Sequence, residues 1–78
     1  MIKAYVLVVT NPGETKNVFA AAKSVAGVKE VHEVMGPYDI VLEIEVESLS
    51  DVPPILSDKI RTIPGIESTT SLVTFPEK

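Results

Sequence analysis

The 78-residue sequence contains no cysteine and no tryptophan, and it has one histidine, His32. Without cysteine the chain forms no disulfides and offers no thiolate to a metal, which fits a reducing, cytoplasmic setting. A single imidazole cannot build the histidine cluster of a zinc site. We therefore expect a cytoplasmic protein without a metal site.

Clustered positive charge and long apolar runs are missing as well. Seven basic residues are outnumbered by eleven acidic ones, which leaves a net charge of −4. Direct nucleic-acid binding uses grouped Lys and Arg side chains to neutralise phosphates, so this composition argues against it. No apolar stretch approaches the roughly 20 residues of a membrane-spanning helix, and the N-terminus lacks the plan of a signal peptide.

The length of the chain, 78 residues, is small for an independently stable domain. A chain of this size buries only about 60% of its unfolded surface when it folds alone. Small scaffolds that lack disulfides and metals commonly gain stability by oligomerising. We therefore expect one domain, residues 1–78, that works as a subunit of an oligomer.

The first half of the chain predicts a strand, a helix and a strand. Residues 2–10 (IKAYVLVVT) are rich in β-branched and apolar side chains and end at an Asn-Pro-Gly turn, which predicts a strand. Residues 14–26 predict a helix that ends at Gly27. Its apolar side chains at helical spacing are Val18, Phe19, Ala22, Val25 and Ala26. Residues 28–35 (VKEVHEVM) predict the second strand.

The second half repeats this order. Residues 39–47 (DIVLEIEVE) alternate most cleanly between apolar and polar side chains and predict a strand. A second helix follows, with Ser50 as the expected N-cap, two prolines in its first turn and Gly65 after its end. Residues 66–75 predict the last strand. The joints SVAGVKEV (24–31) and TIPGIEST (62–69) resemble each other, which indicates an internal repeat.

The order β-α-β-β-α-β predicts a ferredoxin-like α+β sandwich, with a four-stranded antiparallel sheet and two helices on one face. Right-handed crossovers place the first and third strands in the centre. The other sheet face would carry apolar side chains: Tyr5, Leu7, Val9 and Val41. An exposed apolar patch of this kind usually marks an interface. We infer a homodimer that forms through the sheet, as in dimeric α/β barrels.

Candidate catalytic residues are few. His32 could act as a base for a nucleophile, but its position between Glu30 and Glu33 favours a surface histidine. One strand face carries three glutamates: Glu43, Glu45 and Glu47. They could resemble paired catalytic carboxylates, but we interpret them as solvated or interface charges paired with Lys3 or Lys29. The phosphate-loop, dinucleotide and zinc-protease motifs are absent. We expect no enzymatic activity and no cofactor.

Two polar features remain. One is the turn at residues 36–39 (GPYD), and the other is the hydroxyl run at residues 68–71 (STTS). Asp after a turn and Thr on an edge strand are common for purely structural reasons. In the predicted topology, however, the turn and the edge strand can meet at a border between subunits. A carboxylate there can hold an ammonium group while hydroxyls and backbone amides receive a carboxylate, which together describe an α-amino acid.

These segments resemble the ligand-binding domain of the leucine-responsive regulator family (Lrp/AsnC), also called the RAM domain. The resemblance covers nearly all 78 residues and rests on AYVLVV, VAGVKEVHEVMGPYDIVLEIEV, KIRTIPGIESTTSLV and their spacing. It implies a ferredoxin-like domain that dimerises through its sheets. It also implies that dimers assemble into rings, commonly octamers, and bind amino acids at the seams between dimers.

The positions that match the family's ligand site are Gly36, Tyr38, Asp39, Ser68, Thr69 and Thr70. The resemblance implies that Asp39 contacts the ammonium group of the ligand. Full-length family members carry an N-terminal helix-turn-helix domain, whereas this sequence begins at the first strand. We therefore expect a stand-alone effector-sensing module that regulates transcription indirectly, by co-assembly with a full-length relative or through another partner.

Two other interpretations stay open at this point. A small enzyme of the dimeric α+β barrel type would need a polar cavity between sheet and helices, and the aliphatic residues expected there disfavour it. A purely structural oligomerisation domain differs from a ligand-binding domain only through Asp39 and the hydroxyl run.

Overall fold

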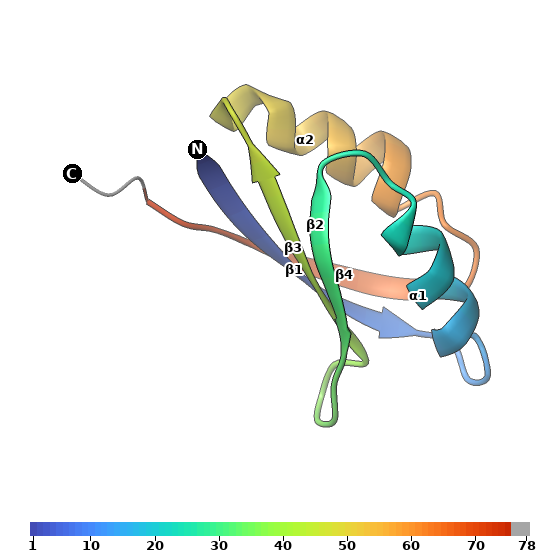
Figure 1. Cartoon of the computed structure of the whole chain (residues 1–78). Coiled ribbons are helices and arrows are strands. Elements are labelled where there is room, and N and C mark those ends of the chain that lie inside the picture. Colours follow the sequence, from blue (N-terminus) through green and yellow to red (C-terminus); the bar gives the residue numbers. More distant parts are fainter. Residues whose placement is uncertain (76–78) are drawn as a thin grey trace.

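The computed structural model describes residues 1–75. Its four strands form one antiparallel sheet in the order β2-β3-β1-β4: β1 (Ile2–Thr10), β2 (Val28–Glu33), β3 (Ile40–Val46) and β4 (Ile66–Val73). Helix α1 (Thr15–Lys23) and a second helix that contains α2 cover the same face of this sheet (Figure 1). The predicted ferredoxin-like architecture, with the first and third strands in the centre, is confirmed.

The second helix changes its winding along its length. It begins as a 3-10 turn (Leu49–Asp51), continues as α2 (Val52–Pro54) and ends as a π-helical segment (Ile55–Ile60). Two successive prolines supply no amide donors, so a regular ladder of α-helical hydrogen bonds cannot form here. The prediction of Ser50 as N-cap is wrong, because Ser48 and Asp51 form the capping box.

The ends of the other elements lie inside their predicted limits. Helix α1 stops at Lys23, three residues before the predicted end, because the Ser24 hydroxyl donates a hydrogen bond to the Ala21 carbonyl at 2.8 Å and competes with the helical ladder. Ala26, expected on the apolar stripe, is exposed. The strands predicted at 28–35, 39–47 and 66–75 are likewise shorter by one or two residues at their ends.

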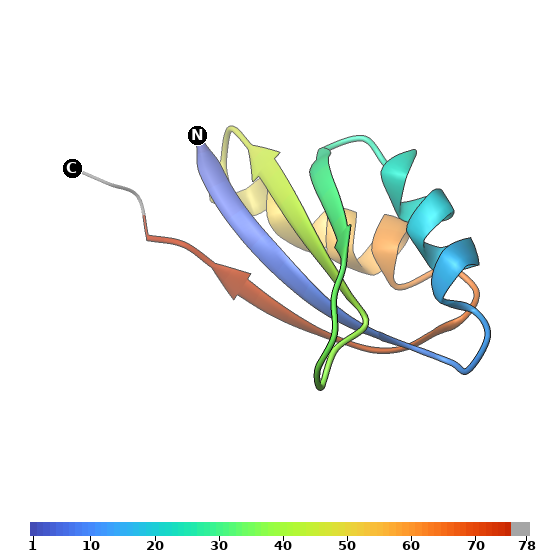
Figure 2. The same ribbon diagram turned by 60° about the horizontal axis from the view of Figure 1, so that its bottom comes forward.

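The core lies between the sheet and the two helices. Alternate residues of the central strands are at most 1% exposed: Ala4, Val6, Val8, Ile40, Leu42 and Ile44. Val18 and Ala22 of α1 and Val52 and Ile60 of the second helix pack against them. The predicted outward-facing residues of β1 and β3 are half-buried, and no helix covers their face of the sheet (Figure 2).

Each edge strand contains an irregularity at the same point of the internal repeat. Lys29 of β2 and Glu67 of β4 are extra residues that have no partner in the register of the neighbouring central strand. Both follow the helix-ending glycine, Gly27 or Gly65, by two positions. A β-bulge of this kind redirects the side chain of the extra residue. The repeat seen in the sequence therefore extends to the detailed shape of both edges.

Candidate functional site

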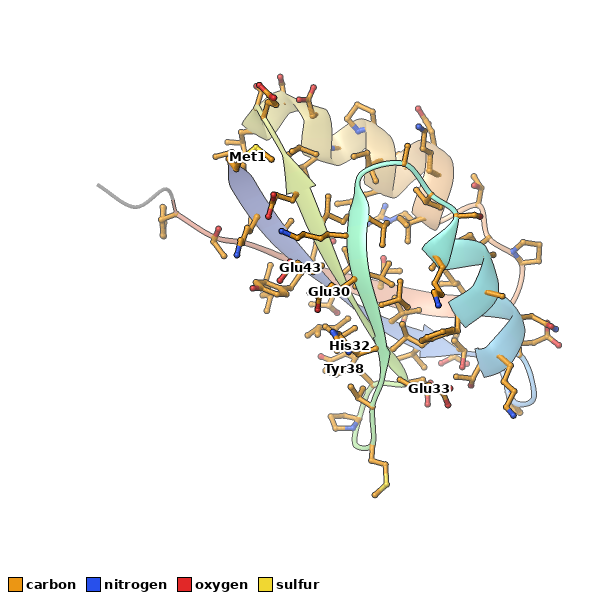
Figure 3. The ribbon with its side chains drawn as sticks, in the orientation of Figure 1. Met1, Glu30, His32, Glu33, Tyr38 and Glu43 are labelled. Atoms are coloured by element: carbon orange, nitrogen blue, oxygen red, sulfur yellow. The ribbon has the colours of Figure 1, made fainter. Side chains whose placement is uncertain are left out.

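The turn at residues 36–39 forms the tip of the β2–β3 hairpin, which projects from one end of the sheet (Figures 1 and 2). Gly36 has a φ of +134°, which side chains with a Cβ rarely adopt, although the space around it is open. Met35 beside it is 98% exposed. Tyr38 is half-buried and lies on the side of the hairpin that faces away from α1 (Figure 3).

Asp39 joins the start of β3 to the end of β1. Its Oδ2 atom accepts a hydrogen bond from the Thr10 amide at 2.9 Å and a longer one from the Thr10 hydroxyl at 3.3 Å. The Thr10 hydroxyl also lies 2.7 Å from that of Thr15, the first residue of α1. Asp39 therefore has a structural contact in its own chain, and it is also partly exposed to solvent.

The hydroxyl run of β4 divides between the two faces of the sheet, as the sequence predicted. Ser68 and Thr70 pair with Val9 and Leu7 and lie on the open face, whereas Thr69 pairs with the buried Val8 and points to the helix side.

Asp39 and Ser68 lie on opposite sides of β1. Asp39 directly precedes the Ile40–Val8 pair on one side, and Ser68 pairs with Val9 on the other. Two strand spacings, roughly 10 Å, separate such positions. This is a backbone spacing, and the Asp39 carboxylate shortens it by reaching across to the Thr10 amide of β1. Within one chain β1 therefore lies between the strands that carry Asp39 and Ser68.

A cleft of about 300 Å³ opens where the second helix meets β4. It is lined by Arg61, Ile66, Glu67, Ser68 and Thr69. The sequence pointed to the two hydroxyl residues but not to Arg61 or Glu67. The available signal was that Arg61 is the only arginine of the chain and lies four residues before the helix-ending Gly65.

The open sheet face carries a row of charges (Figure 3). Glu30 and Glu43 lie directly opposite each other on neighbouring strands. The Glu30 Oε1 atom lies 2.9 Å from the His32 Nε2 atom, at hydrogen-bond distance. Lys29 and Glu45 form an ion pair at 3.2 Å, and the Glu45 carboxylate raises the pKa of Lys29 above its ordinary value of 10.5. The interpretations of His32 as a surface histidine and of Glu45 as a partner of a lysine are confirmed.

Residues 1–75 offer neither a cluster of metal ligands nor a membrane-spanning helix. No group of three or more His, Asp or Glu side chains in this part of the chain is placed to hold a metal ion. Within the same residues, no helix has the length and apolar character needed to cross a bilayer.

The βαββαβ sheet, its uncovered face and its polar border positions define a small ligand-binding module. The chain belongs to the Lrp/AsnC ligand-binding domain family, whose model matches residues 3–77. It is 33% identical over 75 residues to an uncharacterised helix-turn-helix-type transcriptional regulator of Pyrococcus furiosus, a match that covers 92% of this chain and 50% of the relative. The chain therefore spans about half the length of this curated relative.

Two further similarities come from a solved structure and from an enzyme. The crystal structure of a hypothetical protein of Pyrococcus horikoshii superposes with a TM-score of 0.90 at 31% identity, and the match covers 99% of this chain and 93% of that one. A homocitrate synthase of Sulfurisphaera tokodaii is 42% identical over 50 residues, which cover 63% of this chain and 11% of the enzyme.

Proposed function

We propose that this protein is an effector-sensing module of the cytoplasm. It binds a small molecule, an amino acid, at seams between the dimers of a homo-oligomer and regulates the transcription of amino-acid metabolism genes indirectly. The observation that supports this most directly is the separation of Asp39 from Ser68 across β1. β1 lies between their strands within one chain, so in this proposal a second copy completes the site.

The dimer in this proposal forms through the uncovered sheet face. Four apolar side chains there are half-buried within a single chain: Tyr5, Leu7, Val9 and Val41. Covering them removes apolar surface from water. The hairpin tip and the outer edge of β4 lie at the ends of this face and stay available for contacts between dimers, which would assemble into an octamer-like ring.

The ligand contacts in this proposal follow the chemistry of the matching positions. The Asp39 carboxylate contacts the ligand's ammonium while its Oδ2 atom accepts a hydrogen bond from the Thr10 amide. Gly36 and Tyr38 shape the turn around the ligand, and hydroxyls on β4 of another copy receive its carboxylate. A ligand at such a seam shifts the assembly toward the state that presents the completed site, by no more than its difference in affinity for the two states.

A solved relative supports an amino acid as the ligand class. A transcriptional regulator of Neisseria meningitidis has been crystallised in complex with L-Met, and its structure matches this chain with a TM-score of 0.84 at 15% identity. The full-length partner in this proposal is a regulator of the same family, which supplies the DNA-binding domain. The acidic chain itself makes no direct contact with DNA.

The proposal is tested by native mass spectrometry of the protein with and without each of the twenty amino acids. We expect a dimer-based ring that gains ligand mass or changes size with one of them. Asp39→Asn keeps an oxygen for Thr10 but removes the charge, so it is expected to weaken binding about tenfold while lowering the free energy of unfolding by only about 0.5 kcal/mol. A protein that binds none of the twenty would refute the proposed function.

The similarity to homocitrate synthase favours a second candidate role. A unit of this kind within an enzyme would sense an amino acid for catalysis rather than for transcription. In this alternative the chain would regulate such an enzyme in trans. Mixed complexes with the full-length regulator of the same cell, detected by native mass spectrometry, would support the transcriptional role. Mixed complexes with the enzyme instead would support this alternative.

A further inference from the structure

The internal repeat creates two related clefts, one at each edge of the sheet. The first, at β2, is lined by Lys23, Val28, Lys29, Glu30, Val31 and His32. The second, at β4, is lined by Arg61, Ile66, Glu67, Ser68 and Thr69. Each cleft has a basic residue four positions before the helix-ending glycine and a bulged, charged residue two positions after it. The two clefts therefore share one plan.

The charges of the β2 cleft are satisfied within the chain. Lys29 is paired with Glu45 at 3.2 Å, and His32 lies 2.9 Å from Glu30. The Lys23 ammonium lies 5.4 Å from the centre of the Phe19 ring, at the distance of a cation–π contact. Each of these charged side chains of the β2 cleft therefore has a contact within the chain.

The two charged side chains of the β4 cleft, Arg61 and Glu67, differ from those of the β2 cleft in their contacts. Within residues 1–75, neither Arg61 nor Glu67 forms an ion pair, and the two do not pair with each other although they line the same 300 Å³ space. The bulge at Glu67 sets the direction of its side chain. A guanidinium and a carboxylate that share a cleft without touching leave room for a molecule that carries both opposite charges.

We propose that this cleft holds the head group of an α-amino acid. This inference rests on the proposed function. The Arg61 guanidinium receives the ligand's carboxylate through parallel N–H donors, and the Glu67 carboxylate shares the ligand's ammonium with Asp39 of a neighbouring copy. The Thr69 hydroxyl, which lies on the helix side of β4, completes the hydrogen bonds. The head group thus lies between this cleft of one chain and the hairpin of a neighbouring copy, so two copies complete the site.

The test uses calorimetry with the amino acid that binds the wild-type protein best, its 2-oxo acid and its decarboxylated amine. Arg61→Gln is expected to weaken the amino acid and the oxo acid about tenfold and to spare the amine. Glu67→Gln is expected to weaken the amino acid and the amine about tenfold and to spare the oxo acid. Lys59→Gln and Glu47→Gln remove the same charges from exposed positions outside the cleft and serve as matched controls.

The outcomes separate this inference from the proposed function. Unchanged affinities in both cleft variants overturn the inference. If Asp39→Asn alone weakens binding, the amino acid is held at the hairpin, so this cleft assignment fails while the proposed function stands. If no amino acid binds the wild-type protein, both fail. Weakened binding in Arg61→Gln and Glu67→Gln, with the opposite selectivity for oxo acid and amine, supports the inference.

Discussion

Replacing Asp39 by Ala removes the acceptor that holds the end of β1. Thr10 is 8% exposed, and its amide donates to the Asp39 carboxylate at 2.9 Å. Hydrogen bonds to charged groups contribute about 1.5–3 kcal/mol, and an amide left without a partner costs a similar amount. Asp39 itself is only half-buried, so solvent reduces this figure. We expect Asp39→Ala to lower the free energy of unfolding by about 1.5 kcal/mol.

Urea denaturation followed by circular dichroism measures this change. For a chain of this size the unfolding free energy falls by about 1 kcal/mol per molar urea, so the midpoint is expected to fall by about 1.5 M. The protein concentration is kept fixed, because association raises the apparent stability of an oligomer. Asp39→Asn keeps an oxygen acceptor, so we expect its free energy of unfolding to fall by about one third as much as that of Asp39→Ala.

Asp58→Ala is the matched control for this measurement. Asp58 is an exposed aspartate whose backbone carbonyl, not its side chain, accepts the hydrogen bond from the Thr62 hydroxyl. Exposed substitutions of this kind change stability by about 0.5 kcal/mol or less. A midpoint for Asp39→Ala equal to that of Asp58→Ala would show that the contact with Thr10 does not stabilise the fold.

The remaining predictions concern the core, a joint, the open face and one ion pair. Leu42 is 1% exposed, so Leu42→Ala opens a cavity in the core. We expect it to lower the free energy of unfolding by about 3 kcal/mol, measured by the same urea titration. Gly65 has a φ of +98°, and a Cβ added there would lie 2.8 Å from the Cβ of Glu14, the residue before α1. We expect Gly65→Ala to lower the free energy of unfolding by at least about 1 kcal/mol, and wild-type stability would contradict this. Leu7→Asp is expected to elute as a monomer in size-exclusion chromatography, and a dimeric elution volume would refute the sheet interface. Because the pKa of Lys29 is raised in the fold, its ion pair stabilises below pH 10.5 and is lost as the pH rises beyond its pKa. Glu45→Gln should lower that pKa in an NMR titration.

The sequence predicts the element order, the sheet topology and the inward or outward direction of the central strands. These features follow from side-chain periodicity, which local residues determine. The alternation of Ser68, Thr69 and Thr70 between faces is confirmed for the same reason. The N-cap at Ser48 was missed because Ser48 and Ser50 are equally suitable residue types, and only the capping box with Asp51 distinguishes them.

The site could be predicted only in part. The Asp39–Thr10 contact joins residues 29 positions apart, so no local pattern reveals it. The bulges at Lys29 and Glu67 leave no periodic signal, because one extra residue in an edge strand looks like ordinary sequence. The cleft around Arg61 depends on how the irregular second helix meets β4, and this is set by tertiary packing.

The bulge at Glu67 also bears on how proteins of this kind can diverge. Glu67 is an insertion in the ladder between β1 and β4, and the pairing of Ser68 with Val9 and of Thr70 with Leu7 lies entirely beyond it. Loss or exchange of this one residue leaves the remaining register intact. Exchange of Glu67 can therefore alter the charge of the β4 cleft without disturbing the alternation that keeps the core in place. At this position the charge of the cleft and the register of the sheet can change independently.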